Sequence, residues 1–228
     1  MQANVRRFDR TAANIANVNS VGYRAEGSRG LAGTFLSTGN PLDLAVQRDG
    51  WFRVASYNGS SFGEIMYTRA GDFHLDASGS LVAADGRYVI GYALDATGRP
   101  TVTEIPLQMP SGTASVTIGD DGVVTALDAQ GNATRVGAIS LARFSNPDGL
   151  EAAGGGLYRA TSAAGAEQTG AFGGIESGVL ETSNVDLASS IVDTFVANAG
   201  FTASTRTFDT AAEMLGELAR LGERYRTS

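Results

Sequence analysis

The 228-residue sequence contains no cysteine and no lysine. Without cysteine the chain has no disulfides, no cysteine-ligated zinc and no cysteine nucleophile. Its 17 basic residues are all arginines, and 24 acidic residues outnumber them, which gives a net charge of −7. This acidic balance argues against non-specific binding to nucleic acid or to an anionic membrane surface. We therefore expect no nucleic-acid partner.

Long apolar runs are also missing. No run approaches the ~18 residues of a membrane span. The sequence opens with MQANVRRFDR, which lacks the apolar region of a signal peptide. We expect no membrane insertion, and any export uses a route without a cleaved signal peptide. With 43% hydrophobic residues, the chain is still long enough for the core of one or two domains.

Signals for chemistry are sparse. His74 is the single histidine, and a lone strand histidine usually points outward. The G-x-S-x-G match at residues 59–63 lies between two expected strands, not between a strand and a helix as a hydrolase elbow requires. Residues 120–122 and 154–156 fit neither calcium-loop nor dinucleotide spacing. We expect a protein that is not an enzyme and that has no cofactor and no metal.

The N-terminal residues, to about Asn19, predict a helix. Val5, Phe8, Ala12 and Ile15 recur at spacings of four, three and four, as in a heptad seam. Gly22 is suited to a left-handed cap that ends this helix. The narrow stripe favours a paired terminal coil over packing on the helix's own domain.

A second, longer helix is predicted near the C-terminus, over Val185–Leu221. Ser183 and Asp186 have the spacing of a capping box, and Asn184 is an alternative cap. The predicted helix is roughly 55 Å long, more than a domain of this size needs for its own core. It therefore requires a partner. Its apolar positions are Leu187, Ile191, Val192, Phe195, Val196, Ala199, Phe208, Ala211, Ala212, Leu215 and Leu218.

Between the helices, short alternating runs and turn signals predict an antiparallel β domain. Three turns, at residues 76–79, 95–98 and 128–131, begin with Asp and end with Gly, which is typical of a type I turn closed by a left-handed residue. The fold class expected is α+β: a discontinuous helical coiled-coil domain from both termini (residues 1–35 and 175–228) and a central antiparallel all-β domain (residues 36–174). The expected strands are residues 42–46, 51–54, 64–68, 72–75, 80–83, 88–94, 116–118, 123–127, 138–144 and 156–160.

Several motifs together resemble one family. Residues 13–24 (ANIANVNSVGYR) are similar to the N-terminal signature of bacterial flagellar rod and hook proteins, and residues 178–187 (GVLETSNVDL) to the start of that family's C-terminal helix. Residues 213–215 are similar to the end of that helix. Residues 40–45 together with residues 49–52 resemble the family's entry into the β region, and residues 67–73 are also similar to the family. The resemblance covers nearly the whole chain in the right order.

The resemblance implies a structural subunit of the flagellar basal-body rod that polymerises helically through its terminal helices. Its partners would be copies of itself and other flagellar axial proteins of the rod and hook. It also implies export through the flagellar type III export apparatus, without a cleaved signal, to the basal body in the cell envelope and periplasm. The terminal helices would form an inner coiled-coil layer and the β domain an outer layer. The small β region favours a rod subunit over a short hook protein, the second candidate. A β-rich binding module with helical oligomerisation arms would explain the periodicities but not the motifs.

The expected assembly interface lies on the helices and at their ends. The N-terminal stripe can cover only about half of the C-terminal stripe, so an isolated monomer would have frayed or disordered termini. The family's lead before its N-terminal signature is longer than here, so we expect either a misassigned start or a shortened inner layer. Gly200, where the family has a Gln-Arg-Ala-aromatic run, marks an expected weak point or bend. The interface residues are Val5, Phe8, Ala12, Asn14, Ile15, Asn17, Ser183, Asn184, Val185, Leu187, Ile191, Phe195, Phe201, Phe208, Met214, Leu215 and Leu218.

Overall fold

The computed structural model describes residues 2–26 and 31–226, and the side chains of residues 5–26 and 31–218. The chain divides into two compact units, a helical unit (residues 1–18 and 186–228) and a β unit (residues 19–185). The unit boundaries lie closer to the helices than the 35 and 175 expected from the sequence. The reason is that the segments on either side of the β region pair with it and with each other.

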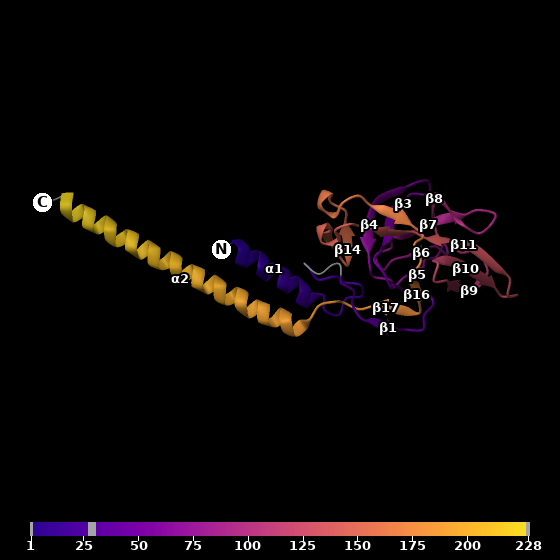
Figure 1. Cartoon of the computed structure of the whole chain (residues 1–228), viewed down its shortest axis with the longest axis horizontal. Coiled ribbons are helices and arrows are strands. Elements are labelled where there is room, and N and C mark those ends of the chain that lie inside the picture. Colours follow the sequence, from indigo (N-terminus) through magenta and orange to yellow (C-terminus); the bar gives the residue numbers. More distant parts are fainter. Residues whose placement is uncertain (1, 27–30, 227–228) are drawn as a thin grey trace. The chain divides into compact units, whose positions relative to one another are not determined.

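The helical unit consists of α1 (Gln2–Ala16) and α2 (Leu187–Arg226), which lie against each other (Figure 1). With 40 residues, α2 is about 60 Å long at about 1.5 Å per residue. It continues through Gly200 without interruption. The expected end of α1 near Asn19 is wrong, because the helix ends at Ala16 and a turn follows.

Gly22 has the expected left-handed backbone, with φ of +64°, but it is not the helix cap. It lies beyond the turn, where its N–H donates to the carbonyl of Glu181 at 2.7 Å. A Cβ at this position would lie 2.2 Å from the backbone N of Ala70. Glycine is therefore required here by close backbone approach as well as by φ.

The β unit contains seventeen strands among the described residues, nearly all of them short, and two 3-10 turns, η1 (Pro147–Gly149) and η2 (Ser162–Ala164). The strands are β1 (Phe35–Ser37), β2 (Leu44–Val46), β3 (Trp51–Tyr57), β4 (Phe62–Thr68), β5 (His74–Leu75), β6 (Leu81–Val82), β7 (Tyr88–Leu94), β8 (Pro100–Pro106), β9 (Thr113–Ile118), β10 (Val123–Asp128), β11 (Ala133–Ile139), β12 (Leu141–Arg143), β13 (Glu151–Gly154), β14 (Leu157–Arg159), β15 (Gln168–Gly170), β16 (Ile175–Ser177) and β17 (Val179–Glu181).

Thirteen of these strands form one antiparallel sheet that curves into a half-barrel. Its main path runs β13-β14-β4-β3-β7-β11-β10-β9, and β5, β6, β8, β12 and β15 branch from it. Two small antiparallel pairs complete the unit, β1 with β17 and β2 with β16. Every pairing found is antiparallel, and the predicted α+β class with a central antiparallel β domain is confirmed.

Strand β3 has packed side chains on both of its faces. Because successive strand side chains point to opposite faces, Trp51 and Phe52 enter different clusters. Phe52 joins the main core with Leu44, Leu81 and Ile139, whereas Trp51 joins a second cluster with Tyr67, Phe144 and Tyr158. Buried side chains therefore pack against both faces of the sheet at β3.

The three Asp–Gly turns are confirmed. In each, the Gly N–H donates to the Asp carbonyl three residues earlier, and Gly79, Gly98 and Gly131 have φ near +80°. The carboxylate of each Asp also accepts two backbone N–H bonds within its own turn. These bonds, together with side-chain bonds from Ser78, Thr97 and Asn132, lower the pKa of the three carboxyls.

The expected strands miss β1, β8, β13, β15, β16 and β17. Most of these are three or four residues long and exist through tertiary pairing. Strand β8 begins and ends with Pro, which argues against a central strand, and it pairs with β7. The single strand expected over residues 138–144 is two strands. The break falls at Ser140, where Ser140 Oγ accepts a hydrogen bond from Arg53 Nη1 at 2.9 Å.

Candidate functional site

The face that α1 turns toward α2 is mostly polar. Thr11 is buried, and Arg7, Asn14 and Ile15 are half-buried, at helical spacing. Arg7 Nη2 lies 2.5 Å from Asp193 Oδ1 of α2, and Thr11 Oγ1 donates to the carbonyl of Arg7 at 2.8 Å. Both partners of the ion pair are part-exposed, so the pair adds little to stability. Its main effect is to fix the position of α1 along α2.

The matching face of α2 carries small side chains. Ser190 and Ala197 are buried there, and Gly200 and Ser204 are half-buried. These positions follow one another at spacings of seven, three and four residues, so they lie on one face of the helix. Small side chains allow the two helix backbones to approach closely. The intrachain helix pair therefore uses small and polar residues rather than large apolar ones.

The expected pairing through the N-terminal apolar stripe is wrong for a single chain. Val5 and Phe8 are 44% and 47% exposed and Ala12 is exposed, while Ile15 alone of the four is half-buried. At about 100° per residue, Val5 and Phe8 lie about 60–120° around the helix from Thr11. The apolar stripe is thus on a flank of the pair, beside the contact face.

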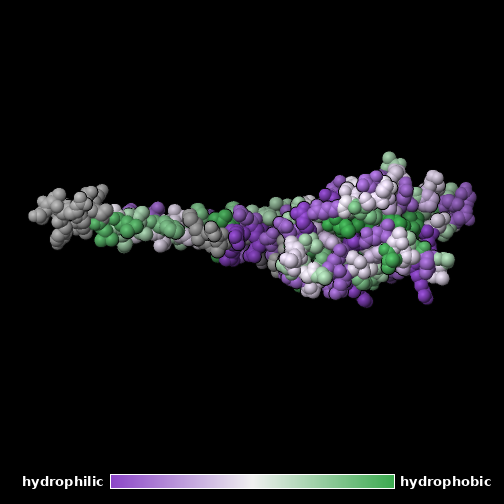
Figure 2. Space-filling model, turned by 90° about the horizontal axis from the view of Figure 1, so that it is seen from above, coloured by the Kyte–Doolittle hydropathy of each residue, from purple (hydrophilic) through white to green (hydrophobic). Residues whose placement is uncertain are grey.

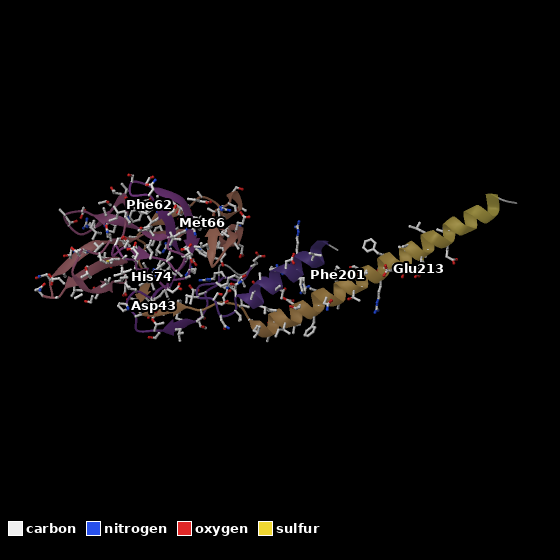
Figure 3. All side chains as sticks on the ribbon, turned by 180° about the vertical axis from the view of Figure 1, so that it is seen from behind. Asp43, Phe62, Met66, His74, Phe201 and Glu213 are labelled. Atoms are coloured by element: carbon white, nitrogen blue, oxygen red, sulfur yellow. The ribbon has the colours of Figure 1, made fainter. Side chains whose placement is uncertain are left out.

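That flank contains an apolar pocket of about 250 Å³. Val5 and Phe8 contribute from α1, and Ala197, Asn198 and Phe201 from α2. Figure 3 shows Phe201 beside the N-terminal part of α1. The exposed side chains Leu187 and Ile191 lie on the same side of α2, by helical spacing. The two helices together therefore form an apolar groove.

Beyond α1, the face of α2 that contacts α1 carries large apolar side chains instead of small ones. From Ser204 the same helical face continues through Phe208, Ala211, Leu215 and Leu218, at spacings of four, three, four and three. Phe208, Leu215 and Leu218 are each more than 60% exposed. Figure 1 shows α2 extending past the N-terminal end of α1, and Figure 2 shows hydrophobic side chains at the surface there. We call this set, Phe208, Ala211, Leu215 and Leu218, the distal stripe.

Asp186 begins α2. Its Oδ1 accepts from the N–H groups of Ala188 and Ser189 at 2.9 and 3.3 Å, and Ser189 Oγ donates to Oδ2 at 2.7 Å. The bond from Ser189 is the main reason that the pKa of Asp186 is lowered. The expected capping box from Ser183 is wrong, because Ser183 Oγ instead accepts from Val185 N at 3.2 Å, before the helix starts.

Asn184, the alternative cap, serves the β unit instead. Its Oδ1 accepts from Ala25 N at 2.7 Å and its Nδ2 donates to the Leu31 carbonyl at 3.0 Å. The segment that follows α1 is thereby fastened to the segment that precedes α2. This is a structural role within the β unit.

Two buried arginines meet one buried carboxylate beside these segments. Arg24, Arg69 and Glu181 are 1%, 5% and 0% exposed. Glu181 Oε1 lies 2.5 Å from Arg24 Nη2, and Oε2 lies 3.3 Å from Arg69 Nη1. Gly33 N also donates to Glu181 Oε1 at 2.8 Å. We call this the arginine–glutamate cluster.

Burial lowers the pKa values of both arginines in the cluster. Desolvation lowers the pKa of Arg24, and the Glu181 carboxylate partly offsets this effect. The pKa of Arg69 falls to about 10, first through desolvation and then through repulsion by Arg24. With a pKa of about 10, Arg69 is charged at neutral pH, and the buried Glu181 carboxylate contacts both arginines. Each of the three residues stands in a different motif of the family resemblance, and no local sequence pattern links them.

The seventeen expected interface residues divide into two groups. The structure brings Val5, Phe8 and Phe201 together in the pocket and spreads the others along the helices. The half-buried ones are Asn14, Ile15, Asn17, Ser183, Asn184 and Val185. The exposed ones are Val5, Phe8, Ala12, Leu187, Ile191, Phe195, Phe201, Phe208, Met214, Leu215 and Leu218.

The features weighed for chemistry have structural roles. Residues 59–63 span the β3–β4 hairpin, where Ser61 N and Ser60 N bond to Asn58 Oδ1. His74 is exposed on β5, as predicted. Among the side chains of residues 5–26 and 31–218, no three of His, Cys, Asp or Glu are grouped to hold a metal ion. In the same part of the chain, neither helix combines the length and apolar character that a bilayer span requires.

Two family models match the chain. Residues 45–126 match the flagellar hook protein FlgE/F/G D1 domain, and residues 176–221 match the flagellar basal body rod FlgEFG protein C-terminal region. Both matched segments begin at strands of the β unit, and the second continues along α2.

Curated relatives agree with these models. The chain is 38% identical over 191 residues to the flagellar basal-body rod protein FlgG of Bacillus subtilis, covering 81% of this chain and 67% of the relative. It is 34% identical over 190 residues to the protein of that name from Agrobacterium fabrum, covering 80% and 65%. The flagellar hook protein FlgE of Borreliella burgdorferi is 38% identical over 109 residues, covering 46% of this chain and 25% of the relative.

The chain thus spans about two thirds of the length of the rod proteins that it matches. Similarity of this extent, with the motifs in order and paired terminal helices around an antiparallel β unit, shows the family. The chain belongs to the flagellar hook and basal-body rod protein family, which is structural and non-enzymatic, and it is a subunit of the FlgG-like rod type.

Proposed function

We propose that the chain polymerises helically into the rod through its helical unit, and that the exposed residues of the expected interface are the contact residues. One observation carries the proposal: the α1–α2 pair is closed by small and polar residues, while its large apolar side chains remain exposed. A soluble monomer gains nothing from such an arrangement.

The free energy available from burying these side chains on assembly is large. Burying a single large apolar side chain contributes about 1.5–3 kcal/mol. The distal stripe supplies Phe208, Leu215 and Leu218, and the groove supplies Val5, Phe8 and Phe201. These two surfaces differ, so a contact between them is heterologous. Heterologous contacts that do not close produce helical filaments.

The pocket suits a side chain better than a small molecule. Its volume of about 250 Å³ is below the range of about 300–1,000 Å³ for ligand sites. A large apolar side chain from the distal stripe of a second copy matches the mostly apolar lining of this pocket. By helical spacing, Asp209 and Glu213 lie on the side of α2 opposite the distal stripe, so they face water when the stripe docks. Figure 3 labels Glu213 on this part of α2.

Other axial proteins of the rod and hook are the partners expected next to copies of this chain. The rod assignment over the short hook alternative is supported by the extent of the similarity. The rod relatives cover about four fifths of the chain, whereas the hook relative covers less than half. Export through the flagellar type III apparatus is part of the same proposal. A strain that lacks this apparatus should retain the chain in its cytoplasm, and export from such a strain would contradict that part.

Purified chain provides the first test. Phe208→Ser and Leu215→Ser should each reduce polymer formation, measured by sedimentation and electron microscopy. Val102→Ser is the matched control, because Val102 is 94% exposed on β8 of the β unit. If the control and the helix variants assemble alike, assembly does not use the distal stripe.

Cells provide the second test. Cryo-electron microscopy of basal bodies from a strain lacking this gene should show a rod truncated before the hook. An intact rod without a hook would instead favour the hook alternative.

A further inference from the structure

A basic pocket lies next to the arginine–glutamate cluster in the β unit. It has a volume of about 440 Å³, within the range of about 300–1,000 Å³ for small-ligand sites. Among the described residues, four arginines line it, Arg24, Arg48, Arg69 and Arg143, and Asp49 is the one acidic lining residue. Gln47 and Ala32 also line the pocket. In a chain with a net charge of −7, this is a local concentration of positive charge.

The inner wall of the pocket is rigid. Arg69 Nη1 donates to the Val46 carbonyl at 2.9 Å, and Nη2 donates to the Arg48 carbonyl at 2.9 Å. Its guanidinium also lies 5.5 Å from the centre of the Trp51 ring. Arg69 is therefore held in one position before any ligand arrives. Its buried Nε–H has no hydrogen-bond partner among the described residues.

The rim supplies two more guanidinium groups. Arg143 Nε donates to the Asp49 carbonyl at 2.9 Å, and its guanidinium stacks 4.2 Å from the centre of the Phe172 ring. These contacts orient Arg143 but use only one of its nitrogens within the described part of the chain. The Arg48 side chain is exposed and forms no ion pair with any described residue.

We propose that this pocket binds an oxyanion, a carboxylate or phosphate group. The planar, bidentate fork of arginine matches the oxygens of carboxylate and phosphate. Here Arg69 and Arg143 are held in position, while the exposed Arg48 side chain can close on the ligand. The Glu181 carboxylate contacts both Arg24 and Arg69 and is itself fully buried. A bound anion would offset the remaining positive charge.

Burial is the main cause of the lowered pKa of Arg69, and repulsion by the neighbouring Arg24 cation comes second. For Arg69, repulsion from Arg24 is a larger effect than attraction by either Glu181 or Asp49. The oxyanion has two sources: a free ion, or the carboxylate of an acidic side chain on a second copy. The binding chemistry is the same, and it does not depend on the proposed mode of assembly.

The test uses the full chain and inorganic phosphate at constant ionic strength, with chloride as the balancing anion. Phosphate should raise the Tm of the wild type, and titration calorimetry should give a saturable isotherm. Arg48→Gln and Arg143→Gln should each weaken the binding about tenfold or more, because charge-assisted hydrogen bonds are lost. Arg99→Gln, an exposed arginine in the β7–β8 turn, is the matched control and should bind as the wild type does.

Phosphate also stabilises proteins generally by exclusion from their surface. An identical Tm rise in the wild type, Arg48→Gln and Arg143→Gln, without a saturable isotherm, would therefore overturn the proposal. An assembly assay distinguishes the two sources of the oxyanion, a free ion and the carboxylate of a second copy. If a second copy supplies the carboxylate, phosphate should slow polymer formation at constant ionic strength, and Arg48→Gln should slow it without phosphate. If a free ion is the ligand, phosphate should bind and leave assembly unchanged.

Discussion

Arg24 Nη2 lies 2.5 Å from Glu181 Oε1, and both side chains are almost completely inaccessible to solvent. The two residues are 157 positions apart in sequence, in the segment after α1 and on β17 before α2. Arg69, at the end of β4, completes the arrangement through the other carboxylate oxygen. The β unit thus joins its first and last segments through a buried ionic contact.

Replacing Glu181 should strongly destabilise the β unit. Glu181→Gln preserves shape but removes the negative charge that faces two buried cations. Removing one partner of a buried ion pair costs about 3–5 kcal/mol. The free energy of unfolding from urea denaturation measures this loss. Glu64→Gln is the control, since Glu64 pairs with Arg159 at 2.6 Å on the exposed surface, and it should change stability little. Equal stability of the two variants would contradict a central role for the cluster.

Gly22 should tolerate no side chain. Gly22→Ala places a Cβ 2.2 Å from the Ala70 backbone N and forces a non-glycine residue to a φ of +64°. Gly86→Ala separates the two effects, because Gly86 has a φ of +81° but open space around it. The control should lose about 1–2 kcal/mol from backbone strain alone. Gly22→Ala should lose clearly more in the same urea experiment. Equal losses would show that the close approach relaxes without cost.

The sequence predicted the fold class, both helices and most of the longer strands. These elements carry strong local signals: the repeat of Val5, Phe8 and Ile15, the Asp–Gly turns, and the alternation through Tyr88–Leu94. The missed strands, such as β1 and β17, have three residues each and exist because Phe35 pairs with Glu181 across the unit. No local pattern encodes that contact.

The sequence was less informative about which faces meet. The apolar repeat of α1 predicts a contact with α2 of the same chain, but Thr11 and Arg7 occupy that contact. Periodicity identifies an apolar stripe but not its partner, and small residues such as Ser190 and Ala197 give weak signals despite forming the intrachain contact. The arginine–glutamate cluster was missed for a similar reason: its three members lie in three separate motifs, and only folding brings them together.

Ala197 should be sensitive to size. It is 3% exposed on the face of α2 that contacts α1, so Ala197→Leu would overpack the contact at a cost of about 1–3 kcal/mol. Val196→Leu is the control one residue away, at a side chain that is 49% exposed. Hydrogen exchange of the α1 amides should accelerate in Ala197→Leu and not in Val196→Leu. Unchanged α1 protection in Ala197→Leu would show that the helices do not rely on this close contact.

The start of α2 should be acid-sensitive. The pKa of Asp186 is lowered from 3.8 by its bonds to Ser189 and Ala188. A lowered folded-state pKa means that the stabilisation is fully present above about 3.8 and is lost as the pH falls through the lowered value. Helix content from circular dichroism should therefore fall in this acid range more in the wild type than in Asp186→Asn, which cannot titrate. Asp95→Asn, which removes a similarly bonded carboxylate from a β turn, should behave as the wild type does. A wild type and an Asp186→Asn variant with parallel acid profiles would contradict the assignment.

The distal part of α2 should gain its protection from other subunits. Residues 208–218 project past α1 with large apolar side chains exposed, whereas residues 190–204 contact α1. A helical segment without tertiary packing is marginally stable in water. In a dilute monomer, amides 208–218 should exchange with solvent much faster than amides 190–204, and assembly should slow them. Phe208→Ser should keep the fast exchange at concentrations where the wild type assembles, because its stripe can no longer dock. Full protection of both segments in the dilute monomer would mean that α2 needs no partner, and the case for assembly through the distal stripe would fail.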